Sequence, residues 1–83
     1  MKITAYAEKT AEHGTFHGTP EEVVDQMRQQ EWPPTPETNE AYMKEVARRS
    51  KVLGQKIKYN NEWEFLQELE RIGDIEKIEV HEE

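Results

Sequence analysis

The string TPEE at positions 19–22 constrains the fold more than any other part of this sequence, because it marks where a helix begins. A threonine followed three residues later by a glutamate is a capping box, in which each side chain binds the other residue's main-chain amide. Pro20 fits the first helical position, since that amide has no partner inside the helix. The helix must end near residue 31 or 32, because the prolines that follow disfavour helical backbone in the preceding residue.

Two further helices are predicted by apolar residues that recur at helical spacing. The second begins near residues 37–39 and ends at Gly54, and the third begins at Asn61 and ends at Gly73. The apolar face of the second helix consists of Tyr42, Met43, Val46, Ala47, Ser50 and Leu53. The third helix has the strongest apolar stripe of the chain, formed by Phe65, Leu66, Leu69 and Ile72. Residues 32–37 are rich in proline and predict a stiff connection between the first two helices.

Four segments alternate apolar and polar residues with the period of two that is typical of β-strands. They cover residues 3–7, 14–18, 55–59 and 76–81, and the predicted order is therefore ββααβαβ. Ile57 and Tyr59 should face inward, and Ile78 and Val80 should share one face of the last strand. The last three elements resemble a βαβ unit, in which the two strands run parallel.

We therefore expect one α+β domain over residues 1–83, with a three- or four-stranded mixed sheet. Its three helices should cover mainly one face of that sheet, and residues 81–83 should fray.

Composition narrows the classes of protein to which the chain can belong. Of its 83 residues, 34% are hydrophobic and 35% are charged, so the core must be small. The absence of cysteine excludes disulfides and thiolate metal sites. No apolar run reaches the roughly 18 residues that a membrane span requires. The N-terminal residues lack the apolar region of a secretory signal, which predicts a cytoplasmic protein.

The sequence contains no signature of an enzyme or of a metal site. The glycine-rich and nucleophile motifs of nucleotide-binding proteins and hydrolases are absent. A core this small leaves little room for a substrate pocket of about 300 Å³. His13 and His17 would lie about 13 Å apart along one strand, too far to share a metal. His81 would approach them only if the last strand paired with the second. We expect no enzymatic activity, no cofactor and no bound metal.

The charges are distributed unevenly along the chain. The net charge is −7, with −5 in residues 1–43, +5 in residues 44–59 and −7 in residues 60–83. Acidic surfaces are attracted to basic proteins and repel nucleic acid at long range. The acidic C-terminal third therefore predicts a docking face for a basic, nucleic-acid-binding partner protein, with a tryptophan as its anchor. The predicted docking face consists of Glu62, Trp63, Glu68, Glu70, Glu76 and Glu79.

The basic centre supports a different interpretation. An antitoxin or transcription accessory could contact DNA through five cations of the second helix and the strand after it: Arg48, Arg49, Lys51, Lys56 and Lys58. The overall acidity and the lack of an aromatic RNA-binding motif argue against direct nucleic-acid binding. The cluster could instead pair with the acidic third helix inside the fold. We therefore expect a protein partner, with the chain itself a monomer or a homodimer; a structural assembly factor is a third alternative.

Three stretches of the sequence are distinctive enough to compare with other proteins. They are FHGTPEEVV at residues 16–24, YMxxVAxR at residues 42–49 and EFLxxL at residues 64–69. They resemble small uncharacterised bacterial proteins carried by prophages and other mobile elements. The small size and the acidity are also similar to those of the anti-CRISPR class, several members of which occupy nucleic-acid-binding surfaces on their targets. The resemblance implies an inhibitor whose carboxylates stand in for phosphates; it implies no catalytic residue.

Overall fold

The computed structural model describes residues 1–7, 14–30 and 38–81. Three strands and three helices occur within them, which confirms the α+β class. In chain order they are β1 (Lys2–Tyr6), β2 (Thr15–Gly18), α1 (Pro20–Gln30), α2 (Asn39–Val52), α3 (Glu62–Ile72) and β3 (Lys77–His81). The proline-rich connection predicted at 32–37 and residues 82–83 of the predicted frayed tail lie outside the described residues.

The sheet has the strand order β2-β1-β3, and both pairs are antiparallel. The predicted mixed sheet with a parallel βαβ unit is therefore wrong. Residues 55–59 form no strand, and α3 leads directly into β3, which runs back along β1. Thr4 of the central strand lies opposite His17 on one side and Glu79 on the other. This register decides which side chains share the face of the sheet turned away from the core.

Residues 55–59 lie outside the sheet because α3 supplies the hydrogen bonds that a neighbouring strand would otherwise supply. The amide of Lys58 donates to Glu68 Oε1 over 3.0 Å, and Arg71 donates to the carbonyl of Lys56 over 2.8 Å. Ile57 is buried, as its alternation with polar residues predicts, and Tyr59 is half-buried. The alternation thus identified an extended segment correctly, but the segment packs on a helix rather than in a sheet.

Side-chain caps fix the beginnings of the three helices. The capping box of α1 is confirmed, since the Thr19 amide donates to Glu22 Oε1 and the Glu22 amide donates to Thr19 Oγ1. Asn61 Oδ1 accepts from the Glu64 amide at the start of α3, and Gly73 ends that helix in a left-handed conformation. Thr38 caps α2 through the amide of Ala41. Each cap satisfies a main-chain donor that the helix itself leaves without a partner.

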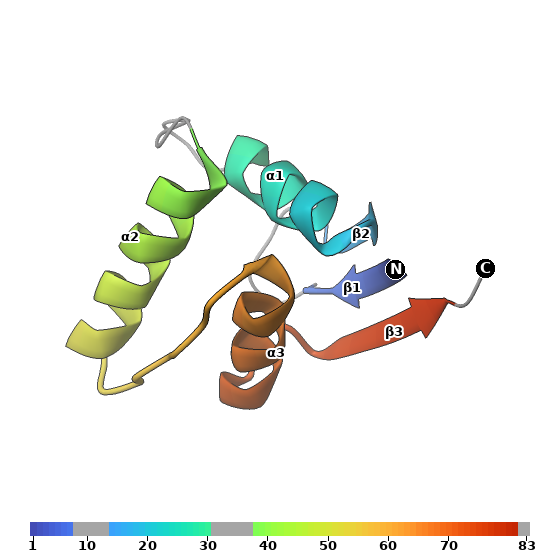
Figure 1. Ribbon diagram of the computed structural model, residues 1–83. Coiled ribbons are helices and arrows are strands. Elements are labelled where there is room, and N and C mark those ends of the chain that lie inside the picture. The colour runs from blue at the N-terminus through green and yellow to red at the C-terminus, as the bar shows by residue number, and fades with distance from the viewer. Residues whose placement is uncertain (8–13, 31–37, 82–83) are drawn as a thin grey trace.

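The core lies between one face of the sheet and the helices α1 and α3 (Figure 1). Helix α2 packs mainly on α1, and its Tyr42 ring meets Phe65 of α3 edge to face. Leu66 and Leu69 are buried as predicted, but Ile72 is only partly buried. Leu53, which the spacing places on the apolar face of the second helix, is exposed after the end of α2. Val80 is exposed on the outer strand β3. Within the described residues, no helix is both long and apolar enough to cross a membrane.

Candidate functional site

The acidic residues predicted to form a docking face lie on different sides of the molecule. On α3, Glu68 binds the segment 56–58, whereas Glu70 accepts a hydrogen bond of 3.0 Å from the Ile78 amide of β3. The two carboxylates therefore point to opposite flanks of the helix. Arg71 lies 2.7 Å from Glu68, and its hydrogen bond, together with that from the Lys58 amide, keeps the pKa of Glu68 below its usual value. Both carboxylates hold neighbouring segments of the chain to α3.

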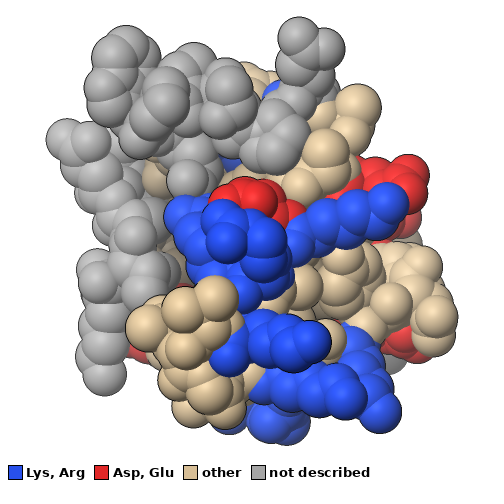
Figure 2. Space-filling model, turned by 90° about the vertical axis from the view of Figure 1, so that its left-hand side faces the viewer, with Lys and Arg blue, Asp and Glu red and all other residues tan. Residues whose placement is uncertain are grey.

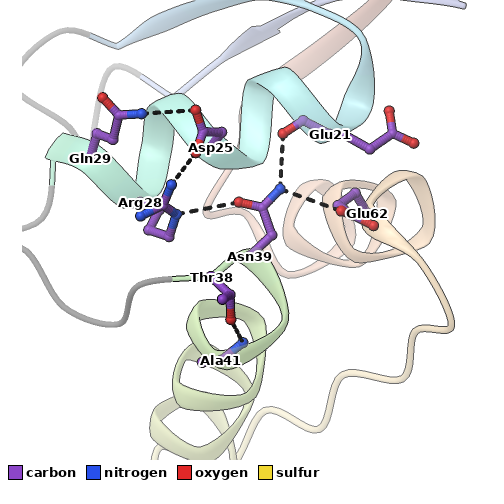
Figure 3. A network of polar contacts seen from close by, with 8 residues as sticks. All are labelled: Glu21, Asp25, Arg28, Gln29, Thr38, Asn39, Ala41 and Glu62. Carbon is purple, nitrogen blue, oxygen red and sulfur yellow. Dashed lines mark hydrogen bonds and ion pairs between the residues drawn. The ribbon is translucent and has the colours of Figure 1, made fainter.

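Glu62 belongs to a polar network that joins all three helices (Figure 3). Asn39, the first residue of α2, donates from Nδ2 to the carbonyl oxygen of Glu21 over 3.0 Å and to Glu62 Oε2 over 3.3 Å. Its Oδ1 accepts from Arg28 Nε at 3.4 Å. Arg28 is also paired with Asp25 of the same helix. The sequence places Asn39 near the start of the second helix, but this role depends on contacts between distant parts of the chain.

The other members of the predicted docking face have different surroundings. Glu79 lies on the face of the sheet turned away from the helices, where it accepts a hydrogen bond from the Tyr6 hydroxyl. That hydrogen bond, followed by the charge of Lys77, keeps the pKa of Glu79 below its usual value. Trp63 is half-buried and packs against the core. Glu76 is exposed, and its carboxylate forms no hydrogen bond or ion pair within the described residues.

The basic residues, in contrast, gather on one side of the molecule. Figure 2 shows Lys and Arg side chains over α2 and the segment that follows it. We call this surface the basic face and define it by six residues: Lys44, Arg48, Arg49, Lys51, Lys56 and Lys58.

Two carboxylates of α2 itself pair with cations of the basic face. Glu40 lies 3.3 Å from Lys44, and Glu45 binds Arg48. Across the described residues, no ion pair includes Lys51, Lys56 or Lys58. The expected pairing of these lysines with the acidic third helix is therefore wrong, because carboxylates of that helix bind main-chain amides instead.

Two exposed apolar side chains border the basic face. Val52 and Leu53 are 76% and 80% exposed at the end of α2. Gly54 follows in a left-handed conformation and turns the chain into the segment that carries Lys56 and Lys58. The surface thus combines unpaired cations with an apolar tip, which is a combination suited to a partner that offers negative charge beside apolar surface.

The sheet brings together two histidines that the sequence pattern places far apart. Thr4 Oγ1 lies 3.0 Å from Nδ1 of His17 and 2.7 Å from Nε2 of His81. The expectation that His81 could approach His17 only by pairing of their strands is wrong, since β1 lies between those strands and its threonine bridges the two rings. A hollow of about 410 Å³ adjoins them. Three or more metal-ligating side chains do not cluster anywhere in the described ranges.

No family model, curated protein or solved structure matches the chain. The likeness to mobile-element proteins therefore stays a prediction.

Proposed function

We propose that the protein is a non-catalytic binding module that contacts the phosphates of a nucleic acid through its basic face. The observation that carries this proposal is the gathering of Lys and Arg side chains on one side of the molecule (Figure 2). Of the six cations that define the basic face, Lys51, Lys56 and Lys58 have no ion pair within the described residues. Lysine and arginine side chains that face solvent release counterions when they bind phosphates, and this release supplies most of the affinity of non-specific binding. This role corresponds to the DNA-binding accessory considered from the sequence.

The net charge of −7 weakens this binding but does not prevent it. At physiological ionic strength, charges farther apart than about 8 Å are largely screened from one another. The molecule measures 37 Å along its longest axis, so acidic groups on its far side act only weakly on a ligand at the basic face. Within that face the only nearby carboxylates on α2 are Glu40 and Glu45, each already paired with a cation. The local charge of the face therefore governs contact with a polyanion.

Direct binding of an oligonucleotide tests the proposal. Fluorescence anisotropy of a labelled duplex should show binding that weakens as salt rises. Replacing Lys51, Lys56 and Lys58 with alanine should weaken it at least tenfold. The same replacement should reduce the slope of log affinity against log salt by about 0.9 for each phosphate that the variant no longer neutralises.

A matched control changes the net charge by the same amount elsewhere in the molecule. Lys77→Glu combined with Gln67→Glu also lowers the net charge by three units, but it does so on β3 and on the exposed side of α3. The control should retain most of the affinity. Equal losses in the two variants would show that only the total charge matters, and the basic face would then have no specific role.

The acidic inhibitor expected from the sequence is a second candidate. The exposed Glu76 and the half-buried Trp63 favour it, because both can face a partner. It is less supported than the basic face, since Glu62, Glu68, Glu70 and Glu79 already accept hydrogen bonds that hold the fold together.

An arginine-rich peptide serves as the basic probe for this second candidate. Binding of the peptide that is abolished in Glu76→Lys with Trp63→Ala, together with no binding of the oligonucleotide, would replace the first proposal with the inhibitor.

A further inference from the structure

The face of the sheet turned away from the core carries a row of polar side chains. Alternation along β1 directs Ile3 and Ala5 into the core and places Thr4 and Tyr6 on the opposite face. Thr4 is nevertheless only 4% exposed, because the imidazoles of the two outer strands close over its hydroxyl group. The hydroxyl group of Thr4 therefore lies at the centre of the face turned away from the core, with a histidine on either side.

The two histidines converge on one atom from different strands. His17 comes from β2 and His81 from β3, and each places a ring nitrogen within hydrogen-bond distance of Thr4 Oγ1. The two nitrogens are therefore less than about 6 Å apart, since each lies within hydrogen-bond distance of the same oxygen. The adjoining hollow is lined by both histidines, Thr4, Lys2, Ile3, Gly18 and Glu22.

Gly18 keeps this hollow in shape. Its φ of +134° is a conformation that other residues rarely adopt. A Cβ atom at this position would lie 3.0 Å from Cβ of Glu22. The glycine therefore lets the end of β2 approach the first turn of α1, and the wall formed by these two elements depends on it.

The hydroxyl group of Thr4 limits which hydrogen bonds the two rings can form with it. A hydroxyl donates one hydrogen and accepts through its lone pairs. When both rings are neutral, at least one of them must donate to Oγ1, because the hydroxyl group has only one hydrogen to give. Where the other ring accepts that hydrogen, addition of a proton converts its nitrogen into a second N–H donor, and the hydroxyl hydrogen becomes free to turn toward another acceptor. Protonation of the pair thus creates a demand for an acceptor beside it.

The other charged groups on this face balance one another. Lys2 and Glu22 line the hollow, and Lys77 and Glu79 follow on β3 beside Tyr6. Hydrogen bonds from the Thr19 amide to Glu22 and from the Tyr6 hydroxyl to Glu79 keep the pKa of each carboxyl below its usual value. Among the described residues of this face, two carboxylates therefore offset two lysines. Histidine is the side chain that ordinarily changes charge between about pH 5 and 8.

We propose that Lys2, Thr4, His17 and His81 form a binding site for a small oxyanion, such as a phosphate or a phosphate monoester, which is taken up together with a proton. An ammonium group, imidazolium N–H groups and a hydroxyl group are the donors that phosphate oxygens accept from. The anion supplies the acceptor that the protonated pair lacks, and its charge offsets the repulsion between the rings. The site is separate from the basic face, which belongs to α2 and residues 55–58.

Sulfate is the sharpest probe, because its charge does not change over the relevant pH range. Calorimetric titration of the whole chain with sulfate should show affinity that rises as pH falls from 7.5 to 5.5, by up to about tenfold for each pH unit when one proton is taken up with each ion. Inorganic phosphate and methyl phosphate, compared at one pH, then distinguish a free anion from a monoester. Nuclear magnetic resonance should show the ring signals of His17 and His81 moving toward their protonated positions when sulfate is added at constant pH.

Variants separate the site from a general effect of charge. His17→Gln and His81→Gln should each abolish the dependence of sulfate affinity on pH, and Thr4→Val, which keeps the β-branched shape, should weaken binding severalfold. Two controls should retain both the sulfate affinity and its dependence on pH. They are Lys77→Ala, which lies on the same face but outside the hollow, and the alanine variant of the basic face. Affinity that does not change with pH, or that falls equally in Lys77→Ala, overturns the proposal. Circular dichroism of each variant excludes loss of folding as the cause.

Discussion

Helices α3 and α2 use their side chains in opposite ways. Helix α3 buries Phe65, Leu66 and Leu69, and its carboxylates accept hydrogen bonds from the main chain of neighbouring segments. Helix α2 is longer, yet Lys51 and Val52 are exposed in its last turn. Lys44 and Arg48 pair within the same helix, and Lys51 forms no ion pair within the described residues. One helix organises the fold, while the other presents a charged surface that the fold does not require.

This difference shows that the amount of charge in a segment does not identify a binding surface. The C-terminal third has the larger net charge, but its acidic groups are largely occupied by structural hydrogen bonds. The basic centre has the smaller net charge, but Lys51, Lys56 and Lys58 form no ion pair within the described residues. Surface ion pairs contribute little to stability, so charges without structural contacts are retained at little cost and can serve binding.

The strongest test of the comparison replaces one leucine in each helix region. Leu69 is 2% exposed, and Leu69→Ala should lower the free energy of unfolding by about 2–5 kcal/mol because it leaves a cavity in the core. Leu53 follows directly after α2, and Leu53→Ala should change the free energy of unfolding by less than about 0.5 kcal/mol. Chemical denaturation of both variants measures the two values. Similar losses would show that the end of α2 is as important to the fold as α3.

Substitutions at the helix caps should change stability less, but they should again affect the whole fold through α3 and mainly one helix through α2. Asn61→Ala removes the acceptor for the Glu64 amide and should cost about 1 kcal/mol of stability. Thr38→Ala removes the equivalent acceptor in α2, but it should act mainly on that helix by speeding amide hydrogen exchange there. Denaturation midpoints and exchange rates together separate the two outcomes. Equal global destabilisation by the two substitutions would contradict the contrast.

The third and smallest expected effect is the loss of folding stability at acid pH. Hydrogen bonds keep the pKa of Glu68 below the ordinary value of 4.5 in the folded chain, so the unfolded chain binds more protons at low pH. The stabilisation is present above pH 4.5 and is lost as pH falls through the lowered folded value.

Substitution separates the main-chain contact of Glu68 from its ion pair. Glu68→Gln should flatten the acid limb of the stability curve more than Glu45→Gln does. Both carboxylates pair with an arginine three residues away, but only Glu68 also holds the Lys58 amide. An equal response of the two variants would mean that the contact with the main chain adds nothing.

Local signals in the sequence predicted much of the fold, and long-range pairing explains what they missed. The capping box at Thr19 and the stripe of α3 act within a few residues, and both are confirmed. The segment 55–59 has the alternation of a strand, but the choice between a sheet and α3 depends on Glu68 and Arg71, which lie far along the chain. Leu53 fits the apolar face of α2 by spacing, yet the helix has no described neighbour at that end to bury it.

The candidate sites were predictable only in part for the same reason. The cations of the basic face are close in sequence, so their grouping was visible before the structure. The contact between His17, Thr4 and His81 depends on the order β2-β1-β3, which no local pattern encodes. The sequence also did not predict that the acidic residues lie on several surfaces. Helical position and strand alternation direct their side chains to different sides.

Mapping the contact surface of a bound oligonucleotide tests the central claim most directly. Amide chemical shifts of the isotope-labelled protein, followed during titration with a short duplex, report which residues the ligand reaches. The account predicts changes concentrated in the second half of α2 and in residues 55–58, with α3 and β3 little affected. Changes concentrated in α3 and β3, or none anywhere at concentrations that saturate a basic control protein, would contradict it.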